Sequence, residues 1–353
     1  MNLTMAAVTA MFATLLSVPS LPAARPLYFP TADNWETVAP ADVGLNTDKL
    51  QSALDYAGRN QSSSVVILHR GKIVAEQHWK PGANGSTKYG RRTIARTKTG
   101  NSIEDVASAQ KSVVSILVGI AQEKGHLKIS DQVDQYLGTG WSKASRQQEQ
   151  AITIRHLITM TTGLTGIGEF EARAGRKWRY NTWAYAKTTE VLEKASSMNR
   201  HELTRKWLTE PIGMKDSKWA PRRSAELQSV NAFGFATSAR DLARFGLMVL
   251  ANGQWAGETI LADRDYLKDS TSTSQKLNPY YGYLWWVNQD ANKPRSRRNA
   301  ALPRDTFSAN GALNRRCWIV PSAQLVVVRI GDTPAAGKGF DSAFWKLLRA
   351  ARE

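Results

Sequence analysis

Apolar and polar positions along the chain indicate β-strands near both ends. Two short apolar runs, 63–70 and 72–79, meet at Arg70 and Gly71, which is the pattern of a β-hairpin. Runs of the same kind return near the C-terminus, at 280–287, 316–321 and 324–331. Their length of six to eight residues favours strands over helices.

Helical periodicity occupies the remaining apolar segments. Residues 45–60 place leucines at helical spacing after a possible cap at Asn46 or Thr47. The clearest 3.6-residue period lies within 234–255, with Thr237 or Ser238 as the cap and an end near Gly253. The segment 343–353 has the pattern of a terminal helix.

This order of elements predicts an α+β fold. Strands from both chain ends would form one antiparallel sheet, flanked by the terminal helices and interrupted by a large helical insert. We expect the sheet region at about 60–105 and 280–353, and the helical region at about 105–275. Since no long polar linker or internal repeat divides the chain, residues 25–353 are predicted to form a single catalytic unit.

The N-terminal segment 1–24 carries no charged side chain and holds a short apolar stretch followed by small residues and prolines. It is typical of a secretory signal peptide, which predicts a secreted or periplasmic bacterial protein. The alternative is an ordinary apolar N-terminus, because the usual early Lys or Arg is missing. Since no other apolar run is long enough to span a bilayer, we expect no stable membrane insertion.

Composition narrows the classes of partner. The formal net charge of +17 is dispersed, and no nucleic-acid-binding motif accompanies it, so we expect no nucleic-acid partner. The five histidines lack metal-ligand spacing, and the expected chemistry needs no metal or organic cofactor. The single cysteine, Cys317, lies in an apolar strand pattern that predicts a buried thiol.

Candidate chemistry lies at 104–125, where Ser108 and Lys111 stand three residues apart at the start of an apolar helix. Side chains at this spacing share one helix face, so the lysine amine can reach the serine hydroxyl. Lysine can accept the hydroxyl proton only if apolar surroundings, the helix dipole or a second cation lower its pKa. The alternative is that Ser108 caps the helix and Lys111 is solvated.

The sequence resembles the serine β-lactamase and penicillin-binding-protein superfamily. The resemblance rests on this Ser-x-x-Lys motif and on stretches similar to that family, in the same order, at 39–50, 152–164, 208–219 and 234–261. The resemblance is closest to its class C-like branch, which holds esterases, nylon-oligomer hydrolases and D-amino-acid peptidases. It implies a β-lactamase/transpeptidase-like fold over nearly the whole mature chain and catalysis through an acyl-serine.

The resemblance also assigns a second motif. Tyr180 takes the position of the tyrosine that works with the lysine in proton transfer. Thr182 stands where the family has an asparagine that contacts the lysine and the substrate's acyl group. We therefore expect Asn181 or Thr182 to supply part of that substrate contact.

The third motif, Lys-Thr-Gly in the family, corresponds by resemblance to Ala309, Asn310 and Gly311. A literal Lys-Thr-Gly at 98–100 precedes the serine and is interpreted as a coincidence in a loop. Gly311 would let the substrate approach the strand, and Asn310 would contact it. The N–H groups of Ala312 and Ser108 would form the oxyanion hole.

Loss of the third-motif lysine argues against a committed β-lactamase. Arg315, together with Arg316, is a candidate to bind a substrate carboxylate in its place, although strand alternation could equally expose one arginine to solvent. The leading hypothesis is a serine hydrolase acting on small esters or amides. The alternatives are a β-lactamase or D-amino-acid peptidase, and a catalytically silent relative that only binds a ligand.

Overall fold

The main sheet has six antiparallel strands drawn from both ends of the chain. The computed structural model describes residues 26–80, 93–222 and 231–352, so the predicted signal peptide lies outside the described residues. The strand order is β2-β1-β14-β13-β12-β9. Their bounds are β1 Ser62–His69, β2 Lys72–His78, β9 Trp286–Val287, β12 Phe307–Gly311, β13 Arg315–Val320 and β14 Leu325–Gly331. The predicted α+β fold, with a sheet built from both termini, is confirmed.

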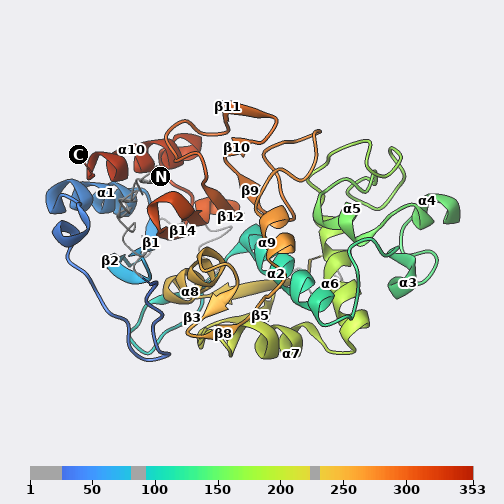
Figure 1. The fold of residues 1–353 in the computed structure, drawn as a ribbon, viewed down its shortest axis with the longest axis horizontal. Coiled ribbons are helices and arrows are strands. Elements are labelled where there is room, and N and C mark those ends of the chain that lie inside the picture. Colours follow the sequence, from blue (N-terminus) through green and yellow to red (C-terminus); the bar gives the residue numbers. More distant parts are fainter. Residues whose placement is uncertain (1–25, 81–92, 223–230, 353) are drawn as a thin grey trace, which may run out of the picture.

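Two terminal helices cover one face of this sheet. Helix α1, Thr47–Arg59, begins after Asn46, whose side chain accepts a hydrogen bond from the Lys49 backbone N–H. It packs beside α10, Phe340–Ala350, so the first and last helices of the chain are neighbours (Figure 1). Apolar residues of both helices form one core layer with the outward-facing positions of β1, β13 and β14.

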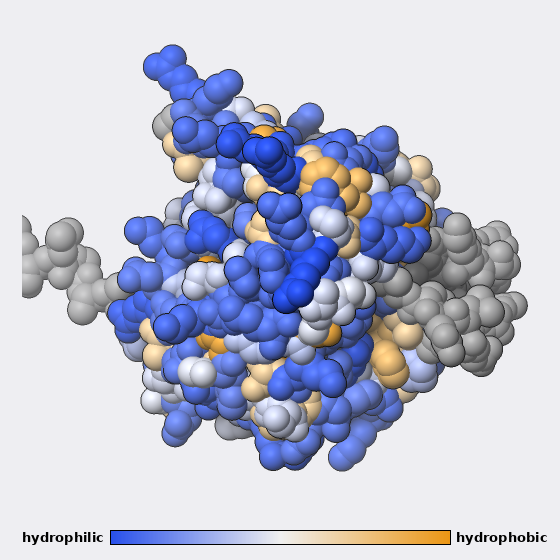
Figure 2. Space-filling model, turned by 90° about the vertical axis from the view of Figure 1, so that its right-hand side faces the viewer, coloured by the Kyte–Doolittle hydropathy of each residue, from blue (hydrophilic) through white to orange (hydrophobic). Residues whose placement is uncertain are grey.

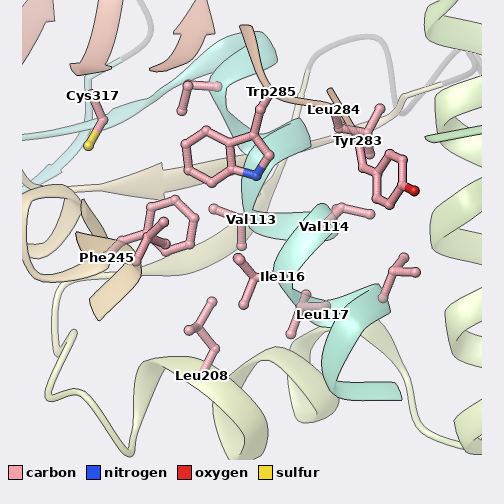
Figure 3. Close-up of a cluster of buried hydrophobic side chains, with 14 of the residues drawn as sticks. Val113, Val114, Ile116, Leu117, Leu208, Phe245, Tyr283, Leu284, Trp285 and Cys317 are labelled. Atoms are coloured by element: carbon pink, nitrogen blue, oxygen red, sulfur yellow. The ribbon is translucent and has the colours of Figure 1, made fainter. Parts of the chain in front are cut away.

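The opposite face of the sheet packs on α8, Ala239–Leu250, and beyond it on α2, Gln110–Glu123. Ser238 caps α8, as predicted. Figure 3 shows apolar side chains around α2, where Phe245 and Trp285 stack with ring centroids 5.7 Å apart and Cys317 is buried nearby. Since α2 is buried along nearly its whole length, its N-terminal end is held rigidly.

A second sheet corrects the predicted extent of the helical region. Four strands pair in the order β3-β4-β6-β5, with bounds β3 Thr93–Arg96, β4 Ser102–Asp105, β5 Lys218–Pro221 and β6 Phe233–Thr237. The last two fall inside the segment expected to be helical. Strand β6 runs directly into the cap of α8, so its five residues merged with the helical pattern in the sequence.

The helical region lies on the other side of α2 from the main sheet (Figure 1). Its elements are α3 Asp134–Leu137, α4 Arg146–Gln150, α5 Ile154–Ile158, α6 Thr182–Ser196, α7 Arg200–Thr204, a π-helical turn Arg205–Thr209 and α9 Arg264–Ser270. Two short hairpins, β7 Gln254–Trp255 with β8 Glu258–Thr259 and β10 Gln289–Asp290 with β11 Lys293–Arg297, complete the fold. The run 280–287, expected to be a strand, is extended only at β9, because Leu284 has a positive φ of 62°.

The outer face of the helical region is mostly hydrophilic. Figure 2 shows polar residues over most of this face, with apolar residues in separate small groups. Among the described residues, the large apolar side chains with substantial exposure are Ile94, Ile167, Phe170 and Leu277. No helix within the described ranges is both long and apolar enough to cross a membrane.

Candidate active site

Ser108 lies in a short 3-10 turn, Ala107–Ala109, between the end of β4 and the start of α2. Ala107 has a positive φ of 52°, a strained conformation for a residue with a Cβ. Two hydrogen bonds hold the turn in this conformation. The Ala107 N–H donates to Asp105 Oδ1 at 2.8 Å, and the Val106 N–H donates to the Phe235 carbonyl at 2.9 Å. The turn is therefore fixed before any substrate binds.

Lys111 fulfils the geometric expectation for the Ser-x-x-Lys motif. Its Nζ donates to Ser108 Oγ at 3.2 Å, and only 2% of the residue is exposed. Burial, and to a smaller extent the positive charge of Arg222, lower the pKa of Lys111 to about 7. The alternative of a solvated lysine is therefore excluded, and a large fraction of neutral amine is present near neutral pH.

Arg222 belongs to a polar network that sequence reasoning missed. Its guanidinium forms a bidentate ion pair with Asp105, at 2.7 and 2.8 Å, and donates to Gln110 Oε1 at 2.9 Å. The same Asp105 holds the Ala107 N–H, so the network links the serine turn to the cation that acts on Lys111. No local motif marks Arg222, which follows Ser108 by more than a hundred residues.

Two tyrosine rings enclose the lysine amine. Lys111 Nζ lies 5.1 Å from the ring centroid of Tyr180 and 4.3 Å from that of Tyr185. Burial raises the pKa of Tyr180, and a hydrogen bond with Ser108 only partly offsets this effect. Tyr180 therefore keeps its phenolic proton at neutral pH. The structure thus brings together Ser108, Lys111 and Tyr180.

An aromatic cluster extends from Tyr180. The Trp286 ring stacks on it at a centroid distance of 5.9 Å and an interplanar angle of 25°. Tyr281 and Trp178 contact both rings, mostly edge to face. These contacts fix the orientation of the Tyr180 phenol and give the site an apolar wall.

Gly311, at the end of β12, packs directly against the serine turn. A Cβ at this position would lie 2.1 Å from the Val106 carbonyl oxygen and 3.3 Å from the Ala109 backbone nitrogen. Only glycine allows this backbone approach. It brings the strand end that precedes Ala312 beside the turn that carries Ser108.

The N–H groups expected to form the oxyanion hole are free to bind an oxygen. Among the described residues, neither the Ser108 N–H nor the Ala312 N–H donates outside its own three-residue turn. The first N–H groups of such a turn have no acceptor within it. Asn310 adds a further polar group, since its buried Oδ1 has no hydrogen-bond partner in the described part of the chain.

The Asn181 side chain, expected to contact the substrate, is engaged within the protein. Its Oδ1 accepts from the Ala184 N–H at 3.1 Å, which caps α6, and its Nδ2 donates to the Leu164 and Thr165 carbonyls at 2.9 Å each. Since 2% of the residue is exposed, no part of this amide is left for a substrate. Thr182 is the first residue of α6, and no contact of its hydroxyl with Lys111 is observed within the described residues.

Arg315, expected to bind a substrate carboxylate, is also engaged within the protein. Arg315 is 2% exposed and forms a buried ion pair with Glu104, with nitrogen–oxygen distances of 2.7 and 3.0 Å. Ser63 also donates to Glu104. Arg316 is engaged as well, by Asp341 at 3.1 Å and by the Gly311 carbonyl at 2.8 Å. Strand alternation could not reveal these partners, which lie on distant segments.

In the described ranges, no group of three or more His, Cys, Asp or Glu side chains is arranged to hold a metal ion. The literal Lys-Thr-Gly at 98–100 lies in the turn between β3 and β4, as the sequence suggested.

Comparison with known proteins agrees with this fold. The beta-lactamase family model matches residues 47–351. An uncharacterized protein of Alkalihalophilus pseudofirmus is 26% identical over 325 residues, which are 85% of this chain and 91% of that protein.

Solved structures are similar in fold at low identity. A proposed 6-aminohexanoate-dimer hydrolase from Bacillus anthracis aligns with a TM-score of 0.65 at 15% identity, covering 90% of this chain and 86% of that one. EstCE1, a hydrolase with promiscuous acyltransferase activity, aligns with a TM-score of 0.62 at 14% identity, covering 88% and 98%.

In its fold and its serine–lysine pair, this chain is similar to the serine β-lactamases and penicillin-binding proteins. The chain belongs to the beta-lactamase family and is a hydrolase of that superfamily.

Proposed function

We propose that the protein is a carboxylesterase or amidase that cleaves small esters or amides through an acyl-Ser108 intermediate. The observation that carries this proposal is the contact between Ser108 Oγ and a buried lysine whose pKa lies at about 7. A lysine of this kind is mostly neutral just above pH 7 and can accept the proton that the hydroxyl loses as it attacks.

In acylation, Ser108 Oγ attacks the substrate carbonyl carbon and its proton passes to Lys111 Nζ. The carbonyl oxygen becomes an oxyanion, which the N–H groups of Ser108 and Ala312 stabilise. As the bond to the alcohol or amine breaks, the leaving group takes the Tyr180 phenolic proton, and Lys111 returns its extra proton to Tyr180. Because burial raises the pKa of Tyr180, the phenol is protonated when the leaving group departs and has a proton to give.

Deacylation repeats these roles with water as the nucleophile. Water attacks the acyl carbon and gives its proton to the Lys111–Tyr180 pair, while Ser108 Oγ leaves and regains a proton from the same pair. The products are the free acid and the original enzyme. No step needs a redox partner or a reactant other than the substrate and water.

The preference for esters and amides over β-lactams is supported by Ala309, which replaces the third-motif lysine. Relatives in fold include EstCE1, named as a hydrolase, and a proposed hydrolase of a 6-aminohexanoate dimer. Arg315 and Arg316, the two cations first considered for the carboxylate of a β-lactam or a D-amino-acid peptide, are engaged within the protein.

Hydrolysis of p-nitrophenyl butyrate tests the proposal. The wild-type protein should turn the ester over and show the added butyryl mass when quenched during turnover, and Ser108→Ala should lose both. Ser112→Ala is a matched control, because Ser112 donates to the Leu284 carbonyl away from Lys111. No turnover and no adduct with esters, D-amino-acid amides or β-lactams would contradict the proposal and favour a ligand-binding relative.

A further inference from the structure

Arg298 is a cation held beside the site without a hydrogen-bond acceptor. Its guanidinium carbon lies 4.3 Å above the centroid of the Trp286 ring, a cation–π contact. Within the described part of the chain, no oxygen accepts a hydrogen bond from the guanidinium and no carboxylate lies within ion-pairing distance. The residue as a whole is exposed, and its guanidinium is partly buried.

This contact places Arg298 close to the reacting groups. The ring that supports the guanidinium is the same ring that stacks on Tyr180 at 5.9 Å, and Tyr180 interacts with Ser108. Trp286 also pairs with Ser308 on β12, the strand that ends at Gly311. The Trp286 ring therefore contacts both the Arg298 guanidinium and the Tyr180 ring, beside the start of β12.

The local charge balance leaves room for a negative group. The charges of Arg316 and of one carboxylate, Asp341, both act on Arg298. That carboxylate is already bonded to Arg316 at 3.1 Å and to the Asn314 side-chain amide at 3.0 Å. Partial burial and the charge of Arg316 lower the pKa of Arg298. Two guanidinium groups against one carboxylate leave a net positive charge here.

Stacking prepares Arg298 for carboxylate binding. An arginine that rests one face on an aromatic ring keeps its edge N–H groups free, and these match the two oxygens of a carboxylate. The ring also restricts the side chain, so less conformational entropy is lost on binding. An ordinary hydrated surface arginine has neither this support nor this position.

We infer that Arg298, held on Trp286 beside Tyr180, binds a carboxylate of the substrate, so that the preferred esters or amides carry a free carboxylate remote from the scissile bond. This inference rests on the proposed acyl-Ser108 function. It gives the site a cation in place of Arg315 and Arg316, which are committed to Glu104 and Asp341.

Paired substrates test the inference by turnover. The p-nitrophenyl half-ester of adipic acid carries the carboxylate on the acyl half, and 4-acetoxybenzoate carries it on the leaving group. Their neutral counterparts are p-nitrophenyl hexanoate and methyl 4-acetoxybenzoate. In at least one pair, the ratio of kcat/KM for the charged over the neutral substrate should fall about tenfold or more in Arg298→Gln.

Arg295→Gln is the matched control, since Arg295 is an exposed arginine three residues away and should leave both ratios as in the wild type. Arg298→Lys keeps the charge without the planar fork and should retain only part of the preference. The wild-type preference should also weaken as salt is raised, because Arg298 lies at the protein surface.

A binding measurement separates failure of the inference from failure of the proposed function. Calorimetric titration with adipate and with hexanoate needs no turnover. Tighter binding of adipate by the wild-type protein, lost in Arg298→Gln, supports the carboxylate site even if no ester is cleaved. Equal binding of both acids, together with ratios unchanged in Arg298→Gln, would overturn the inference and leave the acyl-Ser108 chemistry intact.

Discussion

Lys111 Nζ lies 3.2 Å from Ser108 Oγ on a side chain that is almost fully buried. This contact gives the serine a base, and it also places an amine where its charged form is poorly solvated. The same burial that lowers the pKa of Lys111 therefore opposes folding while the amine is protonated. Catalytic and thermodynamic consequences follow from this single pair.

Activity should rise with pH as Lys111 loses its proton. Because the pKa of Lys111 is about 7, kcat/KM for p-nitrophenyl butyrate should increase through that pH and level off above it. Arg222→Met removes a cation that lowers this pKa, so the rise should move to higher pH. Arg222→Lys keeps a positive charge and should keep the rise near its wild-type position. A pH–rate profile that does not move in Arg222→Met would contradict the assigned influence of Arg222.

Lys111→Met should abolish turnover and stabilise the fold at low pH. Unfolded lysine holds its proton up to about 10.5, whereas buried Lys111 releases it near 7. The cost of Lys111 is therefore complete below pH 7, shrinks as the pH rises, and vanishes above 10.5. Urea unfolding at pH 6 should show the variant more stable by about 2–4 kcal/mol, with a smaller difference at pH 9. A constant difference over this range would mean that Lys111 is not buried as a neutral amine.

Gly311→Ala should reduce turnover by about a hundredfold or more, since a Cβ placed 2.1 Å from the Val106 carbonyl forces β12 and the serine turn apart. Gly339→Ala is the control, because Gly339 has a φ of −77° and open space around its Cα. Both variants should be compared by kcat and by thermal melting. Full activity in Gly311→Ala would remove the argument that the two backbones must meet to form the oxyanion hole.

Arg315→Met should destabilise the protein without changing its choice of substrate. Removing this guanidinium leaves Glu104 buried without its ion-pair partner, which costs about 3–5 kcal/mol. The double variant Glu104→Gln with Arg315→Met should recover part of the loss, because the uncompensated charge is gone. Unfolding free energies of the two variants check this. A changed preference between the adipate half-ester and its neutral counterpart in a folded Arg315→Met variant would restore Arg315 as a substrate contact.

Much of the fold was predictable because local patterns determine the elements. The hairpin turn at Arg70 and Gly71, the Asn46 cap of α1 and the Ser238 cap of α8 all depend on neighbours in the sequence. The second sheet was not predicted, since β4 pairs with β6 from a segment more than 120 residues away. Such pairing leaves no signal in either strand alone.

The sequence by itself determined that a serine and a lysine lie on one helical turn, because their spacing carries that information. Its resemblance to a known family assigned the tyrosine of the second motif and the glycine of the third. Only the tertiary structure decided which charges are free and which are paired. Arg315 is committed to Glu104, Arg222 acts on Lys111, and Arg298 lies beside Trp286 without an acceptor among the described residues. The physical reason is that ion pairing and burial depend on residues brought together from distant parts of the chain, and these set the pKa of Lys111 and the charge around the site.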